Sequence, residues 1–431
     1  MDPSVTHSVA NSAIEAVWRI ESAKIVAGLA RMTRDVGLAE ELAQEALLAA
    51  IEKWSETGVP DNPGAWLMAA AKNRALDHFR RNKLIEAKHQ EIGRESEEGF
   101  TPDFDAALES DIGDDLLRLI FTACHPVLST EARAALTLRL LCGLTTDEIA
   151  RAFLVPEPTV AQRIVRAKRT LAEARVPFEV PRGDELAARL ASVLEVIYLV
   201  FNEGYSATAG EDWMRPALCE DALRLGRILA ELAPAEPEVH GLLALMEIQA
   251  SRLRARTGPS GEPVLLMDQD RSRWDHLLVR RGLAALDRAE ALGREAGGAL
   301  GPYALQAAIA ACHARAHAAA ETDWKRIVAL YDALAQIAPS PIADLNRAVA
   351  VTMAYGPEEG LALVDAISSE PALRGYHLLP TVRGDFLEKL GRFDEARGEF
   401  ERAASLTRNA REIRLLLDRA AALHPGLRVV K

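Results

Sequence analysis

Aromatic residues, cysteines and long apolar runs are all scarce in this sequence. Phe, Trp and Tyr make up 5% of the 431 residues, and the four cysteines lie far apart without a CxxC pair, which predicts no disulfide framework. No run of about 18 apolar residues indicates a membrane-spanning helix. Met1 to Ala10 lack the basic and apolar regions of a signal peptide. We therefore expect a cytoplasmic protein.

An excess of positive charge is also absent. The chain holds 51 Lys and Arg against 63 Asp and Glu, a net charge of −12, which excludes a globally basic nucleic-acid coat. A local DNA-binding face remains possible, because affinity for phosphate depends on where the charges lie. Ala, Leu, Arg and Glu are abundant and favour helix over strand. The length suits two or three domains, so we expect an all-α, multi-domain fold.

Two stretches of unusual composition divide the chain. Residues 83–112 hold nine acidic and three basic side chains and few apolar ones, which is typical of a solvated linker. Pro177, Pro181 and Gly183 interrupt the helical pattern and mark a second boundary.

The segment AEELAQEALLAAIEKW (39–54) has the pattern of an amphipathic helix. Its apolar residues Leu42, Ala46, Leu47, Ala50, Ile51 and Trp54 recur at three- to five-residue steps and predict a buried stripe. Glu41, Gln44 and Glu45 fall off that stripe and form an acidic face. From these residues alone, an ordinary surface helix with a solvated face is the preferred interpretation.

A loop and a basic helix are predicted next. Gly58, Pro60 and Pro63 interrupt helix between Ser55 and Asp61, and Asn62 is the expected N-cap of the following helix. Residues 62–83 carry five basic groups against one acidic group. A basic face beside a loop can hold phosphates and stack bases, although arginines near a helix end also complement the helix dipole.

The segment LTTDEIARAFLVPEPTVAQRIVRAKRTL (144–171) predicts a helix-turn-helix. Thr145 and Glu148 have the spacing of a capping box. The second helix, from about Pro158 to Leu171, should bury Val160, Ile164, Ala167 and Leu171 and expose Thr159, Gln162, Arg163 and Arg166. These exposed types suit base edges in the major groove. The alternative is a helical hairpin with a basic surface.

The order of these motifs resembles that of a bacterial sigma factor of the sigma-70 family, extracytoplasmic-function (ECF) type. The resemblance covers about residues 10–178. It implies a region 2 helical bundle over 10–82, an acidic linker over 83–112 and a region 4 helix-turn-helix over 113–178. Such a factor is not an enzyme, because the polymerase performs the chemistry, and it needs no cofactor.

The resemblance also implies partners and contact residues. Core RNA polymerase would bind Glu41, Gln44 and Glu45 through its β′ clamp helices and region 4 through its β flap, while promoter DNA would be read at the −10 and −35 elements. The residues implied for the −10 element are Trp66, Lys72, Asn73, Arg74, Asp77, Arg80 and Arg81. Those implied for the −35 element are Thr159, Gln162, Arg163, Arg166, Lys168 and Arg169.

Residues 184–431 extend well beyond such a factor. The segment LGRFDEARGEFERAASL (390–406) resembles the second half of a tetratricopeptide repeat, with Gly391, Ala396, Phe400 and Ala403 at its small and aromatic positions. Weaker second helices begin near Trp324 and Pro357. The steps from Trp324 to Pro357 and from Pro357 to Arg392 are 33 and 35 residues, close to the repeat period of about 34. The chain resembles a subgroup of these sigma factors with such an extension. We expect a TPR-like α-solenoid that contacts the sigma domains in cis or binds partners.

One stretch of the extension gathers charged residues. VLLMDQDRSRWDHLL (264–278) contains Asp268, Asp270, Arg271, Arg273, Trp274 and Asp275. Paired carboxylates and arginines can form a catalytic or ligand site, but no nucleophile or phosphate loop accompanies them. An ion-paired network that pins a long loop is the simpler interpretation. His313 and His317 form a lone i,i+4 pair, and no metal site is predicted.

A sigma factor is therefore the main hypothesis. One alternative is a polymerase-independent helix-turn-helix regulator with a solenoid sensor, which leaves the pattern of residues 39–81 unexplained. A second alternative is an enzyme that uses the DQDRSRWD cluster (268–275).

Overall fold

The structure is a computed structural model that describes residues 3–91, 112–153, 155–206, 209–210, 214–259 and 262–423. The chain forms two compact units, Met1–Ile197 and Tyr198–Lys431. The all-α fold expected from the composition is confirmed. Among the described residues the only strands are the two-residue β1 (Ala209–Gly210) and β2 (Arg408–Asn409), which pair in parallel.

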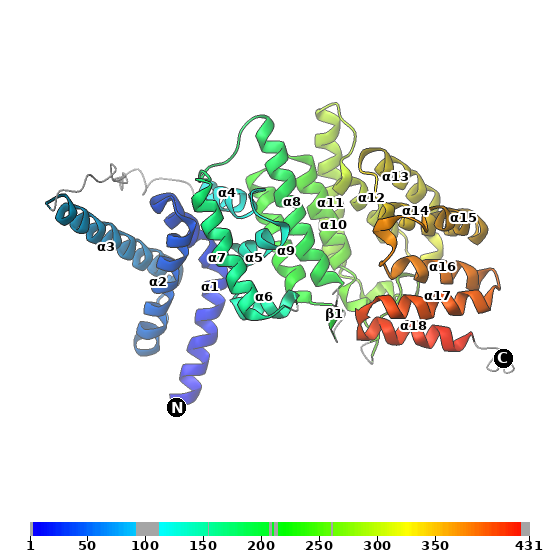
Figure 1. The fold of residues 1–431 in the computed structure, drawn as a ribbon, viewed down its shortest axis with the longest axis horizontal. Coiled ribbons are helices and arrows are strands. Elements are labelled where there is room, and N and C mark those ends of the chain that lie inside the picture. Colours follow the sequence, from blue (N-terminus) through cyan, green and yellow to red (C-terminus); the bar gives the residue numbers. More distant parts are fainter. Residues whose placement is uncertain are drawn as a thin grey trace. The chain divides into compact units, whose positions relative to one another are not determined.

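The described residues of the first unit are almost entirely helical (Figure 1). The helices, in chain order, are α1 (Pro3–Thr33), α2 (Val36–Thr57), α3 (Pro63–Glu91), α4 (Ile112–Ala123), α5 (Thr130–Leu141), α6 (Thr146–Phe153), α7 (Glu157–Glu173) and the first part of α8 (Asp184–Tyr205).

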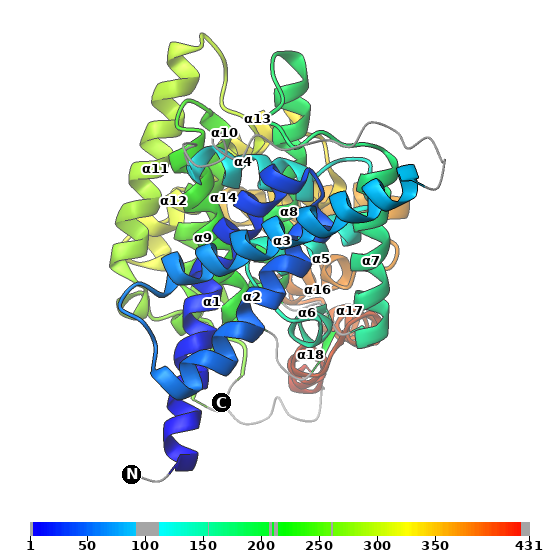
Figure 2. The ribbon, with the colours of Figure 1, turned by 90° about the vertical axis from the view of Figure 1, so that its left-hand side faces the viewer.

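Helices α1, α2 and α3 pack on one another and form the blue group in Figure 2. Their inner faces carry small and aliphatic residues such as Ala27, Leu29, Ala43 and Ala71, which are fully or almost fully buried, so the helices approach closely. The side chain of Asp35 caps α2 by accepting hydrogen bonds from two backbone amides.

The loop between α2 and α3 is shorter than the sequence predicts. Ser55 to Thr57 belong to α2, so this part of the predicted loop is wrong, and the helix ends at Gly58, whose φ of +78° suits glycine. The predicted N-cap is confirmed, because the Asn62 side chain accepts a hydrogen bond from the Ala65 amide at 3.0 Å. Helix α3 continues to Glu91, past residue 82, where the linker was expected to begin. Residues 92–111 lie outside the described residues.

Helices α4 to α7 form a second group within the first unit, in which α5 contacts α4, α6 and α7. The start of α8 bonds to this group, since Arg189 donates to the Phe121 carbonyl at 2.9 Å and Ser192 to the Cys124 carbonyl at 2.6 Å. The unit boundary falls inside α8, between Ile197 and Tyr198, rather than at residue 184, where the sequence placed the start of the extension.

The second unit is also helical, and its longer helices are joined by short turns and 3₁₀ segments. The remaining helices are α9 (Pro216–Leu232), α10 (Pro237–Ala250), α11 (His276–Glu295), α12 (Pro302–Arg315), α13 (Trp324–Ile337), α14 (Pro341–Tyr355), α15 (Pro357–Ile367), α16 (Leu378–Lys389), α17 (Phe393–Leu406) and α18 (Ala410–Ala422). The 3₁₀ segments are η1 (Leu253–Ala255), η2 (Leu266–Asp268), η3 (Arg271–Arg273), η4 (Ala319–Glu321) and η5 (Pro371–Leu373).

From α13 onward, each helix packs mainly on its neighbours in sequence. The segments expected to form second helices of repeats begin helices at Trp324, Pro357 and Phe393. Ala396, Phe400 and Ala403 of α17 are fully buried in one apolar cluster with residues of α14 to α18. Sequential stacking of this kind is typical of helical repeats, and the TPR-like solenoid stays a prediction.

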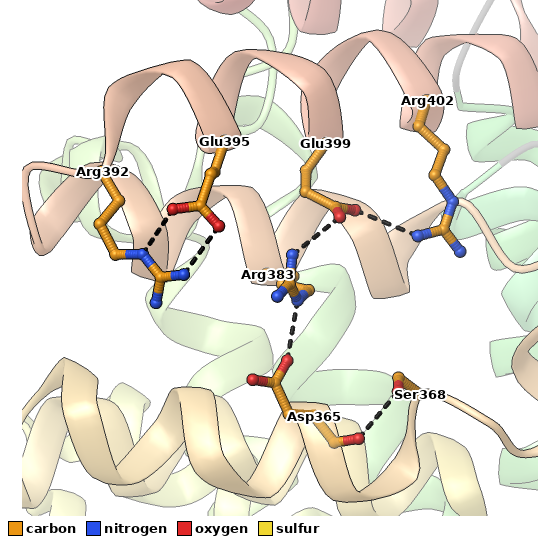
Figure 3. Close-up of polar contacts among 7 residues, drawn as sticks. All are labelled: Asp365, Ser368, Arg383, Arg392, Glu395, Glu399 and Arg402. Carbon is orange, nitrogen blue, oxygen red and sulfur yellow. Dashed lines mark hydrogen bonds and ion pairs between the residues drawn. The ribbon is translucent and has the colours of Figure 1, made fainter.

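Ion pairs join three of these stacked helices (Figure 3). Arg383 of α16 donates to Asp365 of α15 at 2.8 Å and to Glu399 of α17 at 2.9 Å. Burial lowers the pKa of Arg383, but its two carboxylate partners outweigh that effect and raise it above the usual value. Arg383 therefore stays charged and bridges consecutive helices.

Candidate functional site

The outer face of α2 is acidic and apolar. Glu41 and Glu45 are exposed and Gln44 is half-buried, as the sequence predicts. Leu48 continues the same face with 59% of its surface exposed, and Ile51, expected in the buried stripe, is 40% exposed. That prediction for Ile51 is wrong. Exposed apolar residues beside carboxylates form a surface suited to a protein partner.

The inner side of α2 carries a buried ion triad, which we define as Glu40, Arg139 and Lys168. Glu40 is 5% exposed, and its carboxylate accepts a hydrogen bond from Arg139 Nε of α5 at 2.6 Å. Its second oxygen pairs with Lys168 Nζ of α7. Burial raises the pKa of Glu40, but the two cations outweigh burial and hold it below its usual range. The triad ties α2 to the helix-turn-helix within one compact unit.

An aromatic pair stands where α3 begins. Trp66 meets the buried Trp54 edge to face, with ring centroids 5.3 Å apart, and Lys53 Nζ lies 5.9 Å from the Trp66 centroid. Trp66 itself is half-buried, so one part of its ring remains accessible beside the loop. An accessible ring next to a basic helix can stack on a base.

The polar residues of α3 share one face, with one exception. Asn73, Asp77, Arg80 and Arg81 are exposed. At 100° per residue they lie within about 60° of Trp66 around the axis, whereas Lys72 lies about 120° away.

Three polar residues of α3 have ionic partners. Arg80 pairs with Asp77 at 3.4 Å, and Arg74 pairs with Glu45 of α2 at 3.0 Å. The Arg74 contact links the residues expected to bind DNA with those expected to bind polymerase.

Helices α6 and α7 have the expected helix-turn-helix organisation. The capping box is confirmed, because the Glu148 amide donates to Thr145 Oγ1 at 3.2 Å and the Thr145 amide donates to Glu148 Oε2 at 2.8 Å. Pro156 and Pro158 flank the start of α7, where proline is tolerated.

The two faces of α7 differ as predicted. The buried residues are Val160, Ile164, Ala167 and Leu171. Gln162 and Arg166 are exposed, and Thr159 and Arg163 are half-buried.

Lys168 and Arg169, the two cations at the end of the polar face of α7, already form ion pairs within the protein. Lys168 belongs to the buried triad, and Arg169 donates to Glu173 at 2.6 Å on the protein surface. An exposed i,i+4 pair is weak and can be exchanged for a phosphate, whereas the Lys168 pair is largely desolvated. Gln162 and Arg166 are exposed and carry no ion pair among the described residues, unlike Lys168 and Arg169.

A basic cavity of about 780 Å³ in the first unit was not identified from the sequence, because its lining comes from distant segments. Its basic lining residues are Arg31, Arg34, Arg118, Lys168, Arg175 and Arg182. Arg31 and Arg118 share the buried carboxylate of Asp115, at 2.9 and 2.6 Å. Such a lining suits anionic groups.

The charged stretch of the extension forms a pinned loop, but ion pairs do not hold it. Arg271 donates to the carbonyls of His313 and Ala316, at the end of α12, while Asp275 caps α11 and Asp270 caps η3. Within the described residues, no ion pair involves Asp268, Asp270, Arg271, Arg273 or Asp275. The prediction of an ion-paired network is wrong, because hydrogen bonds to helix ends hold the loop instead.

The described part of the chain contains no group of three or more His, Cys, Asp or Glu side chains placed to hold a metal ion. Burial raises the pKa of the Cys124 thiol to about 11 and that of Cys219 to about 12, so both stay protonated near neutral pH. No helix among the described residues is long and apolar enough to cross a membrane.

Comparison with family models finds matches in three segments. Residues 21–85 match sigma-70 region 2, and residues 118–171 match sigma-70 region 4. Residues 189–290 match a family of unknown function (DUF6596). The first two matches contain the acidic face of α2 and the polar face of α7.

Two curated proteins extend the comparison. The uncharacterized protein R00370 of Rhizobium meliloti (strain 1021) is 44% identical over 398 residues, which are 91% of this chain and 92% of that protein. The probable ECF RNA polymerase sigma factor SigI of Mycobacterium tuberculosis (strain H37Rv) is 27% identical over 172 residues, or 39% of this chain and 57% of that protein.

Proposed function

Because the chain belongs to the sigma-70 family, with a region 2, a region 4 and a C-terminal extension, we propose that it binds core RNA polymerase and directs promoter-specific initiation. The family indicates a transcription factor rather than an enzyme. In this proposal the polymerase supplies the chemistry, and the chain acts in the cytoplasm as the promoter-reading subunit.

One observation carries the DNA-reading part of the proposal. Helix α7 buries four apolar residues on one side and exposes Gln162 and Arg166 on the other, behind a capped first helix. Gln can pair with adenine and Arg with guanine in the major groove, which supports recognition of a −35 element. Region 2 would read the −10 element with Trp66, Asn73, Arg80 and Arg81.

The outer face of α2 supports the polymerase-binding part. We propose that Glu41, Gln44 and Glu45 contact the β′ clamp helices, and that the exposed Leu48 and Ile51 add apolar area to the same contact. Polar contacts of this kind set orientation, whereas buried apolar side chains usually supply most of the affinity.

The test of polymerase binding uses the full-length protein and purified bacterial core enzyme. Leu48→Ala and the pair Glu41→Gln with Glu45→Gln should each weaken core binding about tenfold or more, measured by fluorescence anisotropy. Glu231→Gln, on the exposed surface of α9, is the matched control and should bind as the wild type does. Equal affinities for all four proteins would contradict the proposed face.

The DNA test uses the assembled holoenzyme at fixed salt. Arg166→Ala should cost about 1–3 kcal/mol in promoter binding and relax specificity at one base pair, whereas Arg288→Ala on α11 should not. Tight binding of an operator by the isolated chain, unaffected by core enzyme, would favour the polymerase-independent regulator instead.

We also propose that the extension controls this activity in cis or binds a further partner. A shortened chain for this test should end after Ile197 rather than after Pro181, because Arg189 and Ser192 bond to carbonyls of the helix-turn-helix domain. Initiation is compared between the full-length and shortened chains once circular dichroism shows that both are folded. Equal initiation would exclude control in cis.

A further inference from the structure

A second cavity lies within the extension. Its volume is about 320 Å³, and it is lined by η3, the start of α11 and the end of α12 with the residues that follow. Arg271, Ser272, Arg315, His276 and His317 contribute its polar lining and Trp274 an aromatic wall, and the described residues that line it include no acidic side chain. A volume of this size suits a small metabolite.

Positive charge is concentrated behind this cavity. The guanidinium groups of Arg252 and Arg271 lie 5.8 and 5.1 Å from the Trp274 ring centroid. Their hydrogen-bond partners among the described residues are all neutral: a tyrosine hydroxyl, a glutamine, two carbonyls and a threonine. The carbonyl dipoles at the end of α12 offset part of the Arg271 charge.

The pKa values of neighbouring groups reflect the same positive field. Burial, followed by Arg252 and Arg271, lowers the pKa of His313 to about 4, so this ring is neutral near pH 7. Burial and Arg252 also lower the pKa of Arg271, against the opposite effect of Glu321. Asp287 lies 3.9 Å from Arg315 and is exposed, whereas the Asp270 and Asp275 carboxylates of the same loop accept hydrogen bonds from backbone amides. A partly buried cluster of cations with so little compensation is stabilised by an anion.

Buried donors without partners point to the same place. Trp274 is 5% exposed, yet its Nε1 has no hydrogen-bond partner among the described residues, and the same holds for Nε of Arg271. Both residues line the cavity. Leaving a buried N–H group unpaired is unfavourable, so an acceptor bound in the cavity would stabilise both groups.

We propose that this cavity binds a small organic anion through a carboxylate or phosphate group. The anionic group would lie near Arg271 and Arg315, accept a hydrogen bond from Trp274 Nε1, and meet His276 and His317 at the entrance. This site does not depend on the proposed function, because its binding can be measured without polymerase or DNA.

The test titrates the full-length protein with sodium phosphate and, separately, with sodium malonate, while tryptophan fluorescence is recorded. Sodium chloride at equal ionic strength is the reference. We expect a saturable change with at least one of the two anions and none with chloride. Trp274→Phe should abolish most of that change, because it removes the reporting indole beside the ligand. Phosphate alone would indicate a phosphate group, and malonate alone a carboxylate.

Variants locate the binding in this cavity. Arg315→Gln and His317→Gln alter exposed side chains at the entrance and should weaken binding at least fivefold, measured by calorimetry. Arg288→Gln is the matched control, since this exposed arginine of α11 does not line the cavity. Arg271 is left intact because it caps α12. The proposal is overturned if neither anion differs from chloride, or if the Arg288 variant loses as much affinity as the Arg315 variant.

Discussion

Replacing Glu40 by Gln isolates the ion triad between α2 and the helix-turn-helix. The substitution keeps the size of the side chain but removes the negative charge that pairs with Arg139 and Lys168. Arg139 keeps a second bond, to the Leu144 carbonyl at 3.1 Å, so its position is partly maintained without Glu40. The perturbation is therefore mainly electrostatic.

The magnitude follows from burial. Removing one partner of a buried ion pair costs about 3–5 kcal/mol. The side chains of Arg139 and Lys168 are 19% and 20% exposed, so water recovers part of that cost, and the Gln amide oxygen still accepts a bond. We expect a loss of about 2–3 kcal/mol in the free energy of opening α2 from α5 and α7, which is a factor of about 30–150.

Hydrogen exchange of the full-length protein, measured by mass spectrometry, reports the opening of α2 from α5 and α7 peptide by peptide. Peptides from α2 and α7 should exchange faster in Glu40→Gln than in the wild type by up to that factor. Glu41→Gln, the exposed neighbouring carboxylate, should leave exchange unchanged. A double-mutant cycle with Lys168→Met should show coupling, because the two side chains share one contact. Strictly additive effects, or equal exchange in the Glu40 and Glu41 variants, would refute the reasoning.

The effect of pH has a defined sign. Burial raises the pKa of Glu40, but the two cations lower it by more, so its value in the folded protein lies below that in the unfolded chain. The stabilisation is therefore fully present above the unfolded carboxyl pKa of about 4.3 and is lost as pH falls through the folded value. The difference between wild type and Glu40→Gln should be constant from about pH 6 to 8 and shrink below about pH 4.

Three further changes test the packing. Arg383→Met removes the cation that joins the carboxylates of α15 and α17 in Figure 3, and should lower stability by about 1–2 kcal/mol, measured by urea unfolding; an unchanged midpoint would show that the network is solvated. Thr145→Ala removes half of the capping box and should cost about 0.5–2 kcal/mol, seen as faster hydrogen exchange in α6 alone. Gly241→Ala places a Cβ 2.7 Å from the Ala304 backbone nitrogen, so it should lower the melting temperature although alanine favours helix; a higher melting temperature would contradict this close approach.

Local patterns in the sequence predicted the helices and their caps well. The apolar residues of α7 recur at helical spacing and include no polar side chain. Val160, Ile164 and Leu171 are therefore buried, as the spacing predicts. The same holds for the capping residues Thr145 and Asn62, because a cap depends only on its own helix end.

Features that join distant segments could not be predicted. The contact of Glu40 with Arg139 and Lys168 spans about a hundred residues, and no periodicity encodes it. Ile51 fits a buried stripe by spacing, yet it is exposed. Leu48 lies outside the buried stripe predicted for α2. This apolar residue on the polar side of the helix could have indicated that the outer face of α2 is not wholly solvated.

The composition of residues 264–278 predicted a pinned loop, but it did not predict which bonds hold that loop. Its mixture of aspartates and arginines indicates ion pairs, whereas the structure uses Arg271 to cap α12 and Asp275 to cap α11. Opposite charges in one loop pair only if the backbone turns them toward one another. Here the 3₁₀ turns direct them to helix ends instead.

Run-off transcription tests the central claim most directly. Full-length protein is added to purified bacterial core polymerase and a pool of genomic promoter fragments. A sigma factor should produce specific starts that core polymerase alone does not, and Arg166→Ala should weaken them while Arg288→Ala does not. Absence of specific starts, together with no binding to core polymerase, would contradict the account.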